Sequence, residues 1–292
     1  MDALRRVGGE VYIELNPKLV AINLPVLDNL GGRLYIASNE VLEGVSFDEL
    51  TIVPGDFTFV SNGAGASDVS LNFAKFEKAS NNFTFQNNPA VGSVDAFSSL
   101  EEVDGTVDIR GNTTLKDLDG LASLTDVGGS LIIYSNPEIA SAALPAIESI
   151  GGELYIELNP LLNEVTLNAL ESLGNRAYVS NNAELGELSI NSLDVVSGDL
   201  HFASNGSNAD ATVISATALT TIANNLTVTS NPSLVSLRGL SAVEEVRGGF
   251  NVSSNTQLPT CEAVELRDQI QSLAGITGTV TISTNLADTC TP

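Results

Sequence analysis

The chain has 292 residues, 43% of them hydrophobic, so it is long enough to bury a large core as one or two domains. Its 36 acidic and 12 basic residues give a net charge of −24, which repels phosphate backbones and anionic lipid headgroups. This charge argues against nucleic acid as a partner. Because no run of about 18 apolar residues occurs, we expect no direct membrane insertion by this segment.

The first residues carry no targeting signal, since the apolar stretch of a secretory leader is missing there. Leu4 and Val7 match Ile147 and Ile150, which belong to the middle of a repeat. We therefore expect sequence upstream of Met1, with a signal peptide and an N-terminal cap, to be missing from this chain.

A pattern of apolar, any, apolar, any, any, asparagine recurs about every 24 residues down the chain. Its asparagines are Asn16, Asn39, Asn62, Asn88, Asn112, Asn136, Asn159, Asn182, Asn205, Asn231, Asn255 and Asn285. An inward asparagine can satisfy turn backbone that would otherwise lack partners, and one asparagine per coil predicts a ladder.

Each repeat begins with an alternating segment such as 34–36, which is typical of a strand with one buried face. A turn follows, often Asn-Pro, and then a second extended piece such as 22–24, 165–167 or 188–190. Glycine closes the repeat, where we expect a corner that needs φ values other residues resist. The sequence predicts an all-β parallel solenoid of about twelve coils of 23–26 residues.

The solenoid is expected to span residues 1–258 as two continuous halves, about 8–150 and 151–258. The stretch GGEVYIELNP at 8–17 returns as GGELYIELNP at 151–160. Adding 143 to the ladder positions from Asn16 to Asn112 gives those from Asn159 to Asn255, so coil order is duplicated as well as the motif.

Residues 259–292 are expected to form a C-terminal cap. Ala263, Leu266, Ile270 and Leu273 have helical spacing between Thr260 and a glycine at 275, and a last strand follows at 279–282. A disulfide between the only two cysteines would contribute about 3–4 kcal/mol by the chain-entropy estimate. Those cysteines are Cys261 and Cys290. Two free thiols are the alternative, and with one distant histidine the pair does not make a zinc site.

One outward surface combines aromatic and charged residues, and it is the candidate ligand-binding site. Its expected members are Ile132, Tyr134, Tyr155, Tyr178 and His201, edged by Glu153, Arg176 and Asp199. An aromatic patch with a charged rim suits contact with a protein or a glycan. Alternatively, cross-strand aromatic and opposite-charge pairs stabilise a sheet without binding anything.

Catalytic motifs are lacking. The single histidine, His201, is expected to be a surface residue, and neither a nucleophile elbow nor a phosphate-binding glycine loop occurs. Glu153, Arg176 and Asp199 superficially resemble the carboxylate clusters of β-helix polysaccharide enzymes, but their alternating signs also fit simple ion pairing. We expect no enzyme, no cofactor and no metal ion.

The repeats GLASLTDVGGSLIIYSNP and GLSAVEEVRGGFNVSSN, with the closing LPTCEAVELRDQI and TVTISTN, resemble the receptor L-domain family of leucine-rich-repeat-like proteins. The likeness is nearest to bacterial surface and lipoprotein members and extends to fungal cell-wall L-domain proteins. It implies a right-handed β-helix with an asparagine ladder, located outside the cell. The coils run without the cysteine-rich spacer of the receptors, so receptor signalling is not carried over.

The sequence thus predicts a non-catalytic extracellular or cell-surface module that binds a protein or polysaccharide through one sheet face. A passive structural spacer of the cell envelope is the first alternative, and a carbohydrate-active β-helix enzyme is the second.

Overall fold

The computed structural model describes residues 3–288. The chain divides into two compact units, Met1–Ile147 (unit 1) and Glu148–Pro292 (unit 2), and each is built from parallel coils that repeat a strand, a turn, a second extended segment and a corner. The fold is an all-β parallel solenoid with one α-helix in the described chain, as the sequence predicts.

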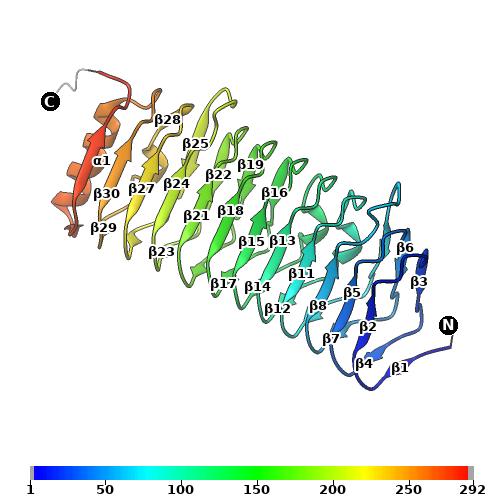
Figure 1. Ribbon diagram of the computed structural model, residues 1–292. Helices are drawn as coiled ribbons and strands as arrows, with labels where there is room; N and C mark the ends of the chain where they lie inside the picture. Colours follow the sequence, from blue (N-terminus) through cyan, green and yellow to red (C-terminus); the bar gives the residue numbers. More distant parts are fainter. Residues whose placement is uncertain (1–2, 289–292) are drawn as a thin grey trace. The chain divides into compact units, whose positions relative to one another are not determined.

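Unit 1 has a main sheet of parallel four-residue strands, one from each coil (Figure 1). The strands are β2 (Val11–Glu14), β5 (Leu34–Ala37), β8 (Phe57–Val60), β11 (Phe83–Gln86), β13 (Val107–Arg110) and β15 (Leu131–Tyr134). Neighbours pair without offset, for example Leu34 with Phe57 and Ile36 with Phe59. The first and third residues of most strands are buried, because alternate side chains of a strand point to opposite faces.

The other sides of the unit 1 coils are less regular. The second face has β3 (Ala21–Asn23), β6 (Gly44–Ser46) and β9 (Ser70–Asn72), and later β16 (Ser141–Ala143). Between β9 and β16 the coils carry the 3-10 turns η1 (Asp95–Phe97) and η2 (Asp119–Leu121), which the sequence pattern did not predict. Two-residue strands form the corners, namely β1 (Arg6–Val7), β4 (Asn29–Leu30), β7 (Ile52–Val53), β10 (Lys78–Ala79), β12 (Glu102–Val103) and β14 (Asp126–Val127).

Unit 2 repeats this plan. Its main sheet contains β18 (Leu154–Glu157), β21 (Ala177–Ser180), β24 (Leu200–Ala203), β27 (Leu226–Thr229), β30 (Phe250–Ser253) and β32 (Val280–Ser283). The second face contains β19 (Glu164–Thr166), β22 (Glu187–Ser189), β25 (Thr212–Ser215) and β28 (Leu234–Ser236), followed by the 3-10 turn η3 (Arg238–Leu240). The corners are β17 (Ser149–Ile150), β20 (Ser172–Leu173), β23 (Val195–Val196), β26 (Thr221–Ile222), β29 (Glu245–Val246) and β31 (Gly275–Ile276).

The number of complete turns is about ten, slightly below the expected twelve. The regular corner series has ten strands, from β7 to β14 in unit 1 and from β17 to β31 in unit 2. The first corner pair, β1 with β4, forms a separate two-stranded sheet. The difference arises at the first coils of the array.

The expected asparagine ladder is present in each unit. Asn62, for example, accepts hydrogen bonds on its side-chain oxygen from the amide nitrogen and the side chain of Asn39, at 3.2 and 3.0 Å, and donates to the Ile36 carbonyl at 2.9 Å. The ladder members from Asn39 to Asn255 are fully buried, whereas Asn16 is exposed and Asn285 is partly buried. Each buried side-chain amide therefore bonds to backbone groups of the turn that would otherwise have no hydrogen-bond partner.

The expected reason for the corner glycines was wrong. None of the corner glycines Gly31, Gly128 and Gly174 has a positive φ, and a Cβ at Gly31 or Gly174 would lie 2.3 or 2.0 Å from a carbonyl oxygen of the preceding coil. These corners need glycine because two backbones approach closely. The left-handed backbone instead occurs immediately before each ladder asparagine, mostly at serine or another non-glycine residue such as Ser38 (φ 54°) or Leu158 (φ 57°).

The two cores differ in chemistry. In unit 1 aromatic rings cluster around Phe57, which packs 4.8 to 5.3 Å from Phe73, Phe76, Phe83 and Phe97. The positions 143 residues later in unit 2 are aliphatic, for example Ala216 in place of Phe73. Both cores exclude water, since these side chains are fully buried.

The C-terminal helix is confirmed as α1 (Thr260–Ser272), and the last strand is β32. The helix buries Ala263, Leu266 and Ile270, but Leu273, which was expected on the same face, ends the helix and is 55% exposed. Cys290 lies outside the described residues, so its expected disulfide with Cys261 stays a prediction.

Candidate functional site

The outward column of the unit 2 main sheet carries three ring side chains in register. Tyr155 on β18 pairs with Tyr178 on β21, which pairs with His201 on β24. Their neighbours Leu154 and Ile156 point inward and are fully buried. Because side chains alternate along a strand, the rings must lie on the outer face of the sheet.

The three rings form a continuous stack. Tyr155 and Tyr178 have ring centroids 4.9 Å apart at 5°, and Tyr178 and His201 have centroids 4.5 Å apart at 2°. The spacing follows from the distance of about 4.8 Å between parallel strands. The next residue in the column is Thr227, so the stack ends at His201. A ligand would therefore meet ring edges along the stack and a ring face at His201.

Arg176 lies beside this stack and connects it to a carboxylate. Its guanidinium carbon is 5.7 Å from the ring centre of Tyr155 and 5.0 Å from that of Tyr178, within cation–π range. Its Nε donates to Glu153 Oε2 at 2.5 Å. The hydrogen bond that Arg176 donates to Glu153 raises the pKa of Arg176, so the guanidinium keeps its charge. Arg176 thus offers its remaining N–H donors at the rim of the stack.

A second carboxylate, Glu157, lies at the other end of strand β18. It accepts a hydrogen bond from the Tyr155 hydroxyl and another, 3.0 Å long, from the side chain of Asn181. The sequence interpretation did not include Glu157. Its signal was the alternation itself, since it lies two residues after Tyr155 on the same outer face.

Asp199 does not extend the charge ladder by an ion pair to Arg176, as the alternating signs suggested. Its Oδ1 accepts from the amide nitrogen and the side chain of Asn225, at 3.0 and 2.8 Å. Asp199, Asn225 and His201 line a shallow pocket of about 150 Å³ with Arg176, Tyr178 and Thr227. This pocket lies at the His201 end of the stack and presents polar and apolar atoms in about equal measure.

His201 is half-buried, and its surroundings favour the neutral ring. Burial is the largest cause and lowers the pKa of His201. Arg176 lowers it further, whereas Asp199 and Glu157 act in the opposite direction. At neutral pH the imidazole can therefore donate one hydrogen bond and accept another.

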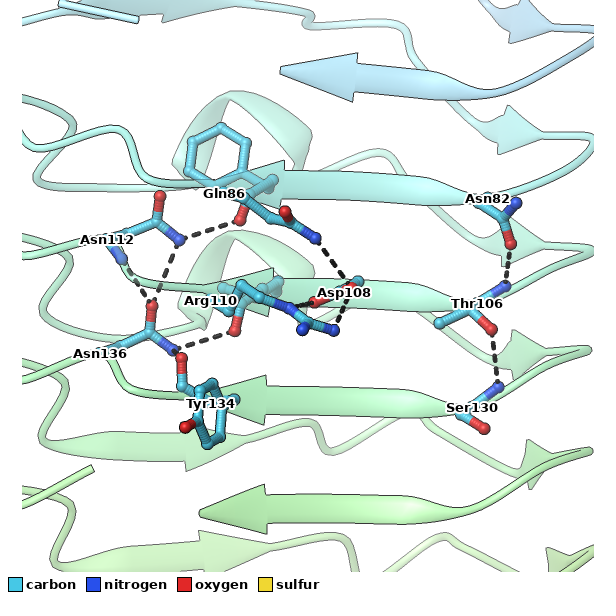
Figure 2. A network of polar contacts seen from close by, with 11 residues as sticks. Asn82, Gln86, Thr106, Asp108, Arg110, Asn112, Ser130, Tyr134 and Asn136 are labelled. Atoms are coloured by element: carbon cyan, nitrogen blue, oxygen red, sulfur yellow. Dashed lines mark hydrogen bonds and ion pairs between the residues drawn. The ribbon is translucent and has the colours of Figure 1, made fainter. Parts of the chain in front are cut away.

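Ile132 and Tyr134, the other expected members, belong to β15 of unit 1. Ile132 pairs with Asp108 and Tyr134 with Arg110 on β13. Asp108 accepts from the Arg110 guanidinium, with Nε at 2.6 Å, and from Gln86 at 2.8 Å (Figure 2). Within unit 1 these two side chains therefore lie beside an ion pair.

Unit 1 carries a second copy of the tyrosine and arginine arrangement. Tyr12 and Tyr35 stack at 4.7 Å and 6°, and the guanidinium carbon of Arg33 lies 5.3 and 5.2 Å from their ring centres. Arg33 Nε donates to Glu10 at 2.6 Å, and Glu14 accepts from both tyrosine hydroxyls. The two copies differ at the third ring, because Thr58 occupies the position of His201.

A polar ladder borders the outer column in both units. In unit 1, Asn82 donates to Asp56 and accepts from the Thr106 amide at 2.9 Å, and the Thr106 hydroxyl accepts from the Ser130 amide at 3.3 Å (Figure 2). Asn225 of unit 2 repeats the contacts of Asn82, since it donates to Asp199 and accepts from Gly249 at 2.7 Å. Asp56 and Asp199 therefore have equivalent roles, since each accepts a hydrogen bond from the asparagine of the next coil.

No group of three or more histidine, cysteine or carboxylate side chains within residues 3–288 could hold a metal ion. Among the same residues, no helix has the length and the apolar character that a membrane span requires. The arrangement in unit 2 offers hydrogen-bond donors, carboxylate acceptors and aromatic surface, which are elements of recognition.

Comparison with known proteins gives one family match. No curated protein and no solved structure matches the chain. Residues 75–175, about a third of the chain, match the model of the Receptor L domain family. This match and the parallel solenoid together support a fold like that of the Receptor L domain.

Proposed function

We propose that the chain is a non-catalytic recognition module located at the cell surface or outside the cell. It binds a protein or polysaccharide partner through the outer face of the unit 2 main sheet. The observation that carries the proposal is the stack of Tyr155, Tyr178 and His201, with Arg176 and a small pocket at its rim.

Three features support binding over simple sheet stabilisation. Tyrosine and arginine are enriched where interfaces concentrate their binding energy. The Arg176 side chain is 38% exposed although it is paired, so its outer N–H groups can reach a partner. The pocket at the end of the stack also brings Arg176, Asp199 and His201 to one surface, where a single ligand group could reach all three.

The similarity to the Receptor L domain favours a protein partner and an extracellular location, because that family's name denotes a receptor segment. A disulfide between Cys261 and Cys290 would suit that location. Fold similarity alone does not identify a partner, so this part of the proposal depends on the surface itself.

A double variant tests the surface. Tyr155→Ala with Tyr178→Ala removes two stacked rings and the cation–π contacts of Arg176 while leaving the buried side chains in place. The parent and the variant are compared on arrays of purified cell-surface proteins and glycans. We expect at least a tenfold loss of affinity for any ligand that the parent binds.

The matched control is Tyr12→Ala with Tyr35→Ala, which removes the equivalent pair from unit 1. Both double variants must show the parent's circular dichroism spectrum. If the unit 2 variant keeps every interaction of the parent, this surface is not the binding site. If the parent itself binds nothing above background, the chain acts as a passive spacer. Turnover of a polysaccharide on a panel of acidic and neutral substrates would instead support an enzyme.

A further inference from the structure

The second face of unit 1 is interrupted next to strand β9. The sheet β3–β6–β9 ends there, and the next coil replaces the expected strand with an irregular segment and η1. In the duplicated unit 2, β25 occupies the position of β9, and β28 continues the sheet beyond it. The same coil of the repeat is therefore closed in one copy and open in the other.

Hydrogen bonds show which edge of β9 is open. The Ser70 amide donates to Glu43 at 2.8 Å, and the Asn72 carbonyl accepts from Phe47 at 2.9 Å, so both residues bond to the β6 side. Alternate residues of a parallel strand bond to opposite neighbours, so the N–H and C=O of Leu71 point the other way. In unit 2 the Ala216 amide donates to Gly239 at 3.0 Å, but the equivalent bond from Phe73 to Ala96 does not occur in the described chain.

The residues at this edge explain why it stays open. A Cβ at Gly239 would lie 1.9 Å from the Ile214 carbonyl oxygen, so η3 can approach β25 only with glycine at that position. Unit 1 has Ala96 there. The rings of Phe73 and Phe97, 5.2 Å apart, also fill core space where unit 2 has Ala216 and Leu240. Both differences keep η1 away from β9.

The result is a groove of about 500 Å³ along the open edge. Its lining combines the backbone of β9 with the acidic side chains of Asp68, Asp95 and Asp117, and with Lys116. Within residues 3–288, no ion pair involves Lys116 or these three aspartates. The groove therefore has a net negative charge and borders the backbone N–H and C=O of Leu71, which bond to no neighbouring strand in the described chain.

We propose that this groove binds an extended basic peptide segment of a protein partner, which adds to β9 as an extra strand. The backbone of Leu71 supplies the ladder hydrogen bonds, in the manner of other edge-strand complexes. Asp68, Asp95 and Asp117 select lysine or arginine side chains over acidic ones, and the chain's net charge of −24 favours the same partners at long range. This site belongs to the second face of unit 1, whereas the tyrosine stack belongs to the main sheet of unit 2, and the proposal does not depend on that stack.

The partly buried side chain of Leu71 adds an apolar contact to this site. The equivalent Ile214 of unit 2, where β28 continues the sheet beyond β25, is only 2% exposed. Leu71 has no such neighbouring strand and is partly exposed in the groove. A peptide with alternating apolar and basic residues would cover Leu71 and meet the aspartates, since alternate side chains of a strand point to opposite faces.

The probe for the test is an acetylated heptapeptide of alternating lysine and valine, compared with the same peptide carrying glutamate in place of lysine. Amide hydrogen exchange of the full chain is followed for the segment 69–73. We expect the basic peptide to slow exchange of the Leu71 amide at least tenfold and to bind at least tenfold more tightly than the acidic one. Protection that appears only elsewhere, or equal binding of the two peptides, would overturn the proposal.

Gly92→Val supplies a blocking variant, because it introduces the residue that unit 2 carries as Val235. The nearest atom to a Cβ at Gly92 is the Thr114 carbonyl oxygen at 3.8 Å, so the fold has room for it. We expect it to weaken peptide binding at least tenfold. The exposed Glu171→Gln of unit 2 is the matched control, with unchanged binding.

Unchanged affinity of Gly92→Val would contradict the groove as the site. Sedimentation of the chain alone tests whether a second copy of the chain occupies the open edge instead of a peptide. Self-association that Gly92→Val abolishes would replace the peptide with a second copy of the chain and overturn the proposal as stated.

Discussion

Units 1 and 2 repeat the same coils, yet they present different surfaces. Both stack two tyrosines under an arginine that is paired with a glutamate. Only unit 2 adds a third ring, His201, and only unit 1 leaves a strand edge open at β9. The asparagine ladder shows no such divergence, because every coil must stack on the next. Surface function can therefore change by single substitutions while the solenoid stays the same.

Replacing a buried ladder asparagine should cost equal stability in both units, and this loss should be the largest effect. Asn62→Ala in unit 1 and Asn205→Ala in unit 2 each leave a buried amide and side chain of the preceding asparagine without an acceptor. Each loss of a buried partner costs about 1–3 kcal/mol, so we expect about 3 kcal/mol or more of stability to be lost in each case. Urea unfolding of both variants measures it.

If the two variants lost amounts of stability that differ by more than about 1 kcal/mol, the two units would not be equivalent. The exposed Asn16→Ala is the control. Since Asn16 lies at the exposed end of the ladder, its replacement should cost less than either buried substitution.

Exchanging glycine and alanine should cost more stability at the closed edge of unit 2 than at the open edge of unit 1. Gly239→Ala forces a Cβ to within 1.9 Å of the Ile214 carbonyl oxygen. Overpacking of this kind costs about 1–3 kcal/mol, and we expect about 2 kcal/mol together with faster hydrogen exchange in β25. Thermal unfolding and exchange of the segment 212–216 provide the measurement.

The reverse exchange, Ala96→Gly, removes a Cβ from a residue that lines the open groove. We expect a cost of only about 0.5–1 kcal/mol, from backbone entropy alone. Equal costs for the two substitutions would mean that close approach does not distinguish the second faces of the units.

The smallest expected effect concerns pH, and it is specific to unit 2. Burial lowers the pKa of His201 below its unfolded value of about 6.5, so the unfolded chain binds the proton more readily. His201 therefore contributes stability that is fully present above pH ~6.5 and is lost as pH falls toward the folded pKa. Melting temperatures of the parent and of His201→Gln, measured from pH 8 to pH 5, should converge at the acidic end.

The matched control for the pH effect is Thr58→Gln in unit 1, which changes the equivalent outward position without removing a titrating group. His201 is the only histidine in the chain, so its ring resonances can be followed by NMR without ambiguity. An NMR titration that places its pKa above 6.5 would contradict the expected direction.

The sequence alone was sufficient to predict which side chains share a column. Strand alternation and the constant spacing of the asparagines place Tyr155, Tyr178 and His201 on one outer face. The structure confirms that placement and the solenoid that produces it. These features depend on local periodicity. Because the same pattern recurs in every repeat, it can be recognised even where single repeats depart from it.

Other features depended on contacts between coils, and only the tertiary structure decided them. The corner glycines are required by the backbone of the preceding coil, and the Glu157 carboxylate is joined to the next coil by Asn181. The edge of β9 stays open because Ala96 and Phe73 hold the next coil away. No local pattern encodes such distances, since the size of a side chain matters only once a neighbour from another coil lies against it. Periodicity thus determined the coils, and steric fit between them determined which surfaces remain open for binding.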